Sequence, residues 1–264
     1  MKNSKKHSKI RKMLSKLIKP TISTPKYKKS ISKSLNSLNA IIAYNQVAGY
    51  SIPTSSIHRP PSQKILRGKL YEKNTINYIN ENWIDGDVIH AGANFGEFLP
   101  SLSKEKKGLI WAFEPNEESF RCCQITILIN KIENNVKVYQ YGLGDKEETK
   151  TLIDKSSTGL PIGSGSYFFD SIKNKYGLKE GQKTSIRTLD NIIPKNRKVS
   201  VIHLDLEGYE EKALLGAYGI IKRSKPILIL ENAFSNTNII KYIEEFGYYH
   251  ETTLDGNDIF KNKK

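Results

Sequence analysis

The sequence lacks acidic residues over its first quarter, and this places nearly all of its net charge there. No Asp or Glu occurs in residues 1–71, which contain 16 of the 42 Lys and Arg residues. Residues 72–264 hold 26 basic residues against 27 acidic ones, so the net charge of +15 belongs to the N-terminal quarter. A near-neutral body is not the basic surface of a nucleic-acid-binding domain, although the first quarter could attract anions.

Cysteine and long apolar runs are also scarce. The two cysteines, Cys122 and Cys123, are adjacent on an expected helix, where their side chains point about 100° apart and cannot form an ordinary disulfide. We expect them to be buried packing residues, and isolated thiols favour a reducing compartment. No apolar run approaches the roughly 20 residues that cross a bilayer, so we expect a cytoplasmic protein.

Residues 1–33 form a basic tail with one periodic segment. Between Ser8 and Lys19 the apolar residues recur with helical spacing and face away from the Lys and Arg residues: Ile10, Met13, Leu14, Leu17 and Ile18. A basic amphipathic helix over residues 8–19 is typical of peripheral contact with an anionic membrane. A solvated tail and a targeting peptide are the alternatives.

Residues 34–69 are expected to be a helical and loop extension of the body that follows. A helix could occupy residues 34–50, and the Pro- and Ser-rich residues 51–62 indicate a loop. The body itself begins near residue 70 and continues to residue 264.

Strands and helices alternate along this body. Short apolar segments predict strands over residues 88–91, 109–113, 136–141, 199–204 and 226–230. Helices are expected between them, over residues 71–83 and 116–131, from residue 209, and over residues 238–246. This alternation favours a parallel α/β sheet with both faces covered, a doubly wound arrangement.

Two segments depart from the alternation. Residues 150–185 show no clear period and are expected to be irregular, with aromatic residues 167–169 that could stack on a sugar or pack their own loop. At the C-terminus, residues 248–252 and 259–261 are strand-like and flank Asp255-Gly256, a favoured tight-turn pair. The sheet should therefore end in an antiparallel hairpin.

The strongest chemical motif is a glycine turn followed by an acid. The first strand ends on Gly92 and Gly96, and the next strand ends on Glu114, about twenty residues after Gly92. In nucleotide-binding βαβ units the glycines admit the ligand to the backbone and such an acid accepts the ribose hydroxyls. The turn is not the G-x-G-x-x-G that a pyrophosphate needs. With the C-terminal hairpin, this favours S-adenosyl-L-methionine over a dinucleotide.

Several motifs in order resemble the FkbM-type S-adenosylmethionine-dependent methyltransferases. They are His90-Ala-Gly-Ala-Asn-Phe-Gly96, Ala112-Phe-Glu-Pro115, Gly142-Leu-Gly-Asp145, Thr188-Leu-Asp190 and Leu204-Asp-Leu-Glu-Gly208. The resemblance covers roughly Tyr71 to Glu231. It implies a class I methyltransferase fold, which is a Rossmann-like doubly wound sheet with a C-terminal antiparallel hairpin, over residues 70–264. It also implies O-methylation of a hydroxyl on a sugar, glycan or natural product.

The same resemblance assigns the cofactor-binding residues. It places the cofactor turn and its partners at His90, Gly92, Ala93, Asn94, Gly96, Glu114 for the ribose, and Asp145 near the adenine. One residue departs from the family pattern, because His90 stands where the family usually has Asp. A protonated histidine would repel the cofactor's ammonium group, whereas a neutral one could accept one hydrogen bond.

Acids at the ends of the later strands are the candidates for chemistry. Asp205 is our first candidate for the base or acceptor-orienting residue and Glu207 the second, with Glu231 nearby. The structural alternative is a helix N-terminal acid for Glu207 and a hydrogen-bonding cap for Glu231. His203 is expected to be a core histidine. We predict no metal centre, although Asp205 and Glu207 could bind Mg²⁺ or Ca²⁺ through oxygen.

Two other functions compete with small-molecule methylation. An RNA methyltransferase could use the basic tail to attract phosphates, but a near-neutral body makes nucleic acid a weaker partner than a small-molecule or glycan acceptor. A methyltransferase fold that has lost activity could serve as an adaptor, with His90 marking lost cofactor affinity.

Overall fold

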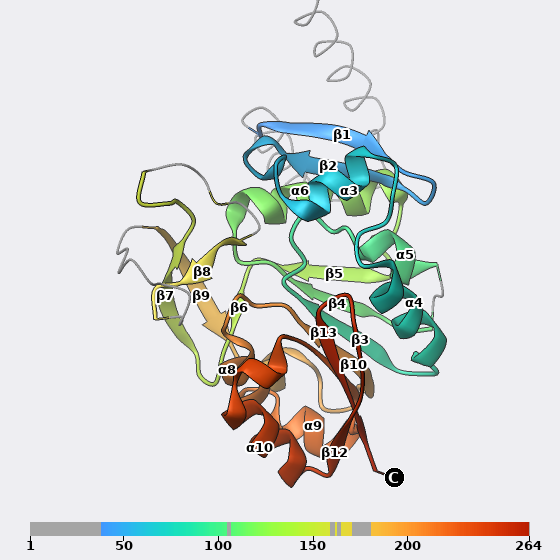
Figure 1. Ribbon diagram of the computed structural model, residues 1–264, viewed down its shortest axis with the longest axis vertical. Helices are drawn as coiled ribbons and strands as arrows, with labels where there is room; N and C mark the ends of the chain where they lie inside the picture. The colour runs from blue at the N-terminus through green and yellow to red at the C-terminus, as the bar shows by residue number, and fades with distance from the viewer. Residues whose placement is uncertain (1–37, 105–106, 159–161, 163–164, 171–180, 264) are drawn as a thin grey trace, which may run out of the picture. The chain divides into compact units, whose positions relative to one another are not determined.

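The computed structural model describes residues 38–104, 107–158, 162, 165–170 and 181–263 (Figure 1). The predicted membrane-contacting helix over residues 8–19 and the rest of the 1–33 tail lie outside the described residues. Residues Asn39–Lys264 form one compact unit. Within the described ranges, no helix combines the length and the apolar character needed to cross a membrane.

A seven-stranded sheet forms the centre of this unit, in the order β12-β13-β11-β10-β3-β4-β5 (Figure 1). Its strands are β3 (Asp87–Ala91), β4 (Ile110–Phe113), β5 (Val136–Tyr139), β10 (Val199–Leu204), β11 (Ile227–Glu231), β12 (Tyr248–Leu254) and β13 (Asn257–Asn262). The first five pair in parallel, and β13 is antiparallel to both of its neighbours. The predicted parallel sheet with a C-terminal antiparallel hairpin, the class I methyltransferase arrangement, is confirmed.

Helices cover both faces of this sheet, because successive apolar residues of its strands point to opposite faces. In β4, Ile110 and Ala112 pack with α4 (Lys73–Asn82), α5 (Leu99–Ser103) and α6 (Glu117–Asn130). The alternate residues Trp111 and Phe113 belong to the core on the opposite face. That face is covered by α7 (Leu189–Ile192), α8 (Glu210–Leu215), α9 (Tyr218–Ser224) and α10 (Thr237–Glu245). The doubly wound arrangement follows from this two-sided apolar pattern.

The predicted helix within residues 34–50 is wrong, because the structure has an antiparallel hairpin there. Its strands are β1 (Ala40–Tyr44) and β2 (Gly49–Pro53). The Asn45 carboxamide oxygen accepts hydrogen bonds from the amides of Val47 and Ala48, and this reverses the chain. A short apolar run such as Ala40–Ala43 has no period that separates helix from strand.

The predicted loop over residues 51–62 also needs correction. It contains the end of β2, the short helix η1 (Thr54–Ser56) and the beginning of α3 (Pro60–Leu66). Proline at the first helical position suits a helix start, because the amide that it lacks would have no helical partner there.

Residues 150–185 are not wholly irregular as predicted. A second sheet has the order β6-β9-β7-β8, from β6 (Gly142–Leu143), β7 (Glu148–Ile153), β8 (Tyr167–Phe168) and β9 (Gln182–Arg187). In β9, Thr184 and Ile186 are buried while their neighbours are more exposed. One strongly apolar residue in a six-residue strand gives little periodic pattern, which explains why the sequence did not reveal it.

The predicted tight turn between β12 and β13 is confirmed. It also caps α4, which comes much earlier in the sequence. Asp255 and Gly256 have φ of 52° and 93°, the left-handed geometry that favours Asp-Gly in hairpins. The Asp255 carboxylate accepts hydrogen bonds from the backbone amides of Asn74 and Thr75, at 2.9 Å and 3.1 Å. It therefore satisfies the first turn of α4, which has no side-chain cap of its own.

We expect Asp255→Ala to lower the free energy of unfolding by about 1–2 kcal/mol, the usual cost of removing a helix cap. Chemical denaturation of the full chain would measure this. Asp255→Asn keeps an acceptor oxygen at the same place and should retain most of the stability. Equal stability of the Ala and wild-type chains would contradict the proposed cap.

Candidate active site

The carboxyl ends of four central strands border one cavity of about 240 Å³. Several predicted site residues from the ends of β3, β4, β10 and β11 line it together: Gly92, Asn94, Glu114, Asp205, Glu207 and Glu231. Open α/β sheets bind their ligands at this end of the strands. Ala93, Gly96, His90 and Asp145 do not line this cavity, although the first two belong to the turn that shapes it.

Two glycines and an asparagine shape the turn after β3. Gly92 has φ of 86°, and a Cβ there would collide with the carbonyl oxygen of Asp205. Gly96 has φ of 87°, and Asn94 between them has φ of 47°. The absence of a side chain at Gly92 therefore lets the ends of β3 and β10 approach each other, in addition to leaving room for a ligand.

Glu114 holds this turn and faces the cavity. Its two carboxylate oxygens accept hydrogen bonds from the backbone amides of Asn94 and Asn116, at 2.7 Å and 2.8 Å. Burial raises the pKa of Glu114 to about 7, even though both amides act to lower it. A carboxylate has about four lone-pair sites, so two remain for a ligand.

Glu97 is a cavity residue that sequence reasoning missed. Its Oε1 accepts a hydrogen bond from the Asn94 side chain at 3.2 Å, and its buried Oε2 has no hydrogen-bond partner among the described residues. Burial raises the pKa of Glu97 to about 8. An acid directly after the glycine turn was the available signal, but the motif itself gives that position no role.

Asp205, Glu207 and Glu231 bring like charges together at the ends of β10 and β11. All three line the cavity, so Asp205 and Glu207 do face the same cleft. Burial, then the charges of Glu231 and Glu207, raise the pKa of Asp205 well above its ordinary value. Glu210 serves the backbone instead, because its carboxylate accepts hydrogen bonds from the amides of Leu206 and Gly208.

His90 lies in the core of the sheet, in a buried polar chain with His203. The two Nδ1 atoms are 2.8 Å apart, and His203 Nε2 lies 3.2 Å from the Asn257 side-chain oxygen. The Asn257 amide donates to Glu72 at 2.8 Å, so His203 donates from Nε2 and accepts at Nδ1 from His90. Burial lowers the pKa of both histidines. Both ring nitrogens of His203 therefore have hydrogen-bond partners, and His203 is a core histidine as predicted. A cofactor contact by His90 stays a prediction.

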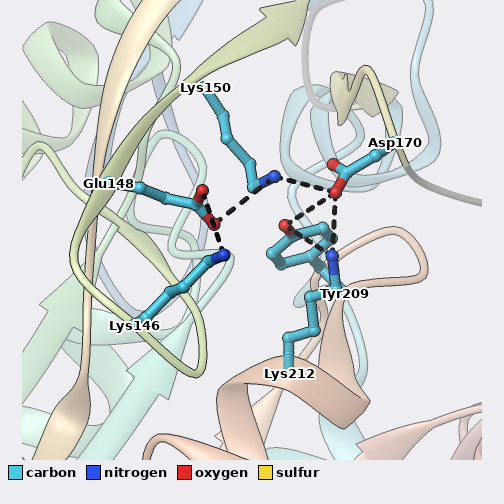
Figure 2. Close-up of polar contacts among 6 residues, drawn as sticks. All are labelled: Lys146, Glu148, Lys150, Asp170, Tyr209 and Lys212. Atoms are coloured by element: carbon cyan, nitrogen blue, oxygen red, sulfur yellow. Dashed lines mark hydrogen bonds and ion pairs between the residues drawn. The ribbon is translucent and has the colours of Figure 1, made fainter.

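An ion-pair cluster joins the second sheet to α8 beside the cavity (Figure 2). Asp170 accepts from Lys150 and Lys212, both at 2.8 Å, and its carboxylate lies 3.3 Å from the Tyr209 hydroxyl. The Tyr209 ring packs on Phe168, which lines the cavity. The cluster therefore fixes one wall of the cavity, whereas the predicted adenine contact Asp145 is exposed at the protein surface.

Comparison with known proteins identifies a family over most of the unit. The family model described as the methyltransferase FkbM domain matches residues 90–249. No curated protein matches the chain.

Several solved structures are similar to this chain at low sequence identity. A methyltransferase FkbM from Methylobacillus flagellatus is 20% identical, with 67% of this chain and 43% of that chain covered and a TM-score of 0.45. A precorrin-6y C5,15-methyltransferase from Geobacter metallireducens is 13% identical, with 74% and 91% covered and a TM-score of 0.45. A Pyrococcus abyssi tRNA (uracil-54, C5)-methyltransferase in complex with S-adenosyl-L-homocysteine is 12% identical, with 84% and 44% covered and a TM-score of 0.43. The chain thus spans less than half the length of the first of these proteins.

Proposed function

Because this chain belongs to the FkbM methyltransferase family, we propose that it transfers a methyl group from S-adenosylmethionine to a hydroxyl oxygen of a sugar, glycan or natural product. The observation that carries the proposal is the shared cavity. Glu114 and the glycine turn lie on the same cavity as the acids Asp205 and Glu207, so a cofactor and an acceptor can meet there.

The polar groups of the cavity suit this cofactor. Glu114 keeps lone pairs for two ribose hydroxyls while its turn contacts are satisfied. Oε2 of Glu97 is a buried acceptor with no partner in the described ranges, and it suits the positive charges of the cofactor's ammonium and sulfonium groups. When bound, the cofactor supplies an electrophilic methyl group on a positively charged sulfur.

Asp205 is the residue that we assign as the base. A hydroxyl becomes a competent nucleophile as its proton passes to a neighbouring carboxylate, while its oxygen forms the new bond to the methyl carbon. A bound S-adenosylmethionine would supply the methyl carbon, with its sulfur as the leaving group. The raised pKa of Asp205 makes it a stronger base than an exposed aspartate, and Glu207 and Glu231 contribute to that shift.

Calorimetric titration of the folded full chain with S-adenosylhomocysteine tests the cofactor site. We expect Glu114→Gln to weaken binding by about ten- to a hundredfold, because it removes a charged acceptor of two ligand hydrogen bonds. Glu117→Gln is the matched control, since Glu117 lies in the same region but its carboxylate pairs with Arg121 on an exposed helix face. Wild-type protein that is folded and binds no S-adenosylhomocysteine would contradict the proposal.

A separate experiment is needed to identify the acceptor atom of the methyl group. The chain is incubated with isotopically labelled S-adenosylmethionine and a set of sugars, amino sugars and phenols, and the products are analysed by NMR. A new O-methyl resonance is expected. Labelled methyl groups found on nitrogen or carbon atoms alone would contradict hydroxyl specificity.

A further inference from the structure

Arg59 lines the cavity, and the cofactor contacts proposed above give it no role. Among the described lining residues it is the sole Lys or Arg, in a cavity lined by five carboxylates: Glu97, Glu114, Asp205, Glu207 and Glu231. In the described part of the chain, Arg59 forms no ion pair with these acids, and its side chain donates instead to a backbone carbonyl. The cavity therefore has acidic groups and a separate cationic group.

The guanidinium group of Arg59 is held in place by contacts with Ile162 and Gly165. Its Nη2 donates a hydrogen bond to the carbonyl oxygen of Ile162 at 2.6 Å. It also lies directly against Gly165, where a Cβ would be 2.7 Å from Nη2 and 2.9 Å from Nη1. The backbone is fixed as well, because the Arg59 amide donates to Ser56 and the Arg59 carbonyl accepts from Gln63. Arg59 is thus a positioned side chain, unlike a mobile surface arginine.

Among the described residues, this guanidinium uses little of its hydrogen-bonding capacity. It has five N–H donors, and the structure shows one of its nitrogen atoms donating to Ile162. Its Nε is buried and has no partner among the described residues. A buried donor without a partner is unfavourable, so a ligand that supplies an acceptor is expected to bind there. The planar fork of arginine matches the paired oxygens of a carboxylate or phosphate.

We propose that Arg59 binds a carboxylate or phosphate group of the methyl acceptor. The acceptor would then be a hydroxyl compound that also carries an anion, such as a uronic acid or a sugar phosphate. This inference rests on the proposed function. The cofactor's own carboxylate is the other source of the same chemistry. Arg59 lies outside residues 90–249, the matched family domain, which contains Gly92, Glu114 and Asp205. A contact outside the shared domain suits the acceptor better than the shared cofactor.

Ligand binding to the full chain loaded with S-adenosylhomocysteine tests this proposal. Affinities for glucuronate, glucose 6-phosphate and glucose are measured by ligand-observed NMR for the wild type, Arg59→Met and Arg67→Met. We expect at least one anionic sugar to bind the wild type about tenfold more tightly than glucose does. Arg59→Met should abolish the difference and leave the affinity for S-adenosylhomocysteine within about threefold of wild type. The exposed Arg67 of the same segment is the control, and its variant should behave like the wild type.

A second variant separates the position of the guanidinium from its charge. Gly165→Ala keeps Arg59 but introduces a methyl group where the guanidinium lies, so it should also reduce the preference for anionic sugars. The proposal is overturned if glucose binds the wild type as tightly as both anionic sugars, or if none of the three sugars binds. It is also overturned if Arg59→Met weakens S-adenosylhomocysteine, because the guanidinium would then hold the cofactor. If S-adenosylhomocysteine binds no form of the chain, the proposed function fails. The affinities of the wild type and Arg59→Met for the anionic sugars, measured without S-adenosylhomocysteine, then still decide the role of Arg59.

Discussion

Replacing Asp205 by asparagine is expected to lower kcat by about 10²- to 10⁴-fold, the usual contribution of a positioned general base. Asparagine has nearly the same shape but cannot take up the acceptor's proton at neutral pH. The affinity for S-adenosylhomocysteine should stay within about threefold of wild type, since Glu114 and Glu97 are intact. Steady-state methyl transfer and calorimetry on the same preparations would separate the two effects. A kcat within threefold of wild type would remove Asp205 from the chemistry.

The pH profile gives an independent test of the same residue. Asp205 acts as a base only when deprotonated, and burial together with Glu231 and Glu207 raises its pKa. Activity should therefore fall as the pH drops through this raised pKa, well above the range of an ordinary aspartate. Glu231→Gln removes a neighbouring negative charge, lowers the pKa of Asp205 and should move the acid limb to lower pH. An acid limb that does not move would mean that another group titrates.

The cofactor side of the cavity was predictable because a local motif encodes it. The strand that ends on Gly92 and the acid Glu114 about twenty residues later are both read directly from sequence, and the structure places both on the cavity. Glu97 directly follows the same turn, but the motif gives that position no role. Arg59 was not predictable in this way. Arg59 reaches the cavity through contacts with Ile162 and Gly165, about a hundred residues away in sequence. Only the tertiary fold brings such residues together.

In the fold, too, the elements encoded by local sequence were predicted, and one that depends on contacts distant in sequence was missed. The central strands β3, β4, β10 and β11 were predicted because each is a mostly apolar run with buried residues on both faces, and the C-terminal hairpin because Asp255-Gly256 favours its turn. The hairpin of β1 and β2 was missed because its stability depends on α6. The amides of Gly49 and Ser51 donate to side chains of Asn130 and Thr126 on that helix. Sequence periodicity carries no information on such long-range hydrogen bonds.

Glu97→Gln is expected to stabilise the ligand-free protein and weaken cofactor binding at the same time. Burial raises the pKa of this carboxyl from 4.5 to about 8, so the folded state opposes its ionisation. Below pH 4.5 the group is protonated in both states and has no effect. Between pH 4.5 and 8 the unfolded chain releases the proton first, and the free energy of unfolding falls by about 1.4 kcal/mol per pH unit. At pH 8 the accumulated cost is on the order of 4 kcal/mol, which an uncharged glutamine would avoid.

Denaturation at pH 5 and pH 8, with calorimetry at pH 8, measures both consequences of Glu97→Gln. The variant should exceed wild-type stability by far more at pH 8 than at pH 5, because only the wild type loses stability through this carboxyl as the pH rises. Its affinity for S-adenosylmethionine should fall by about tenfold or more, since Oε2 is the buried acceptor that we propose for the positive charges of this ligand. A stability gain without loss of affinity would mean that Glu97 does not bind the cofactor. Higher stability together with weaker cofactor affinity would show that ionising the buried Glu97 carboxyl destabilises the free protein and that the bound cofactor offsets this.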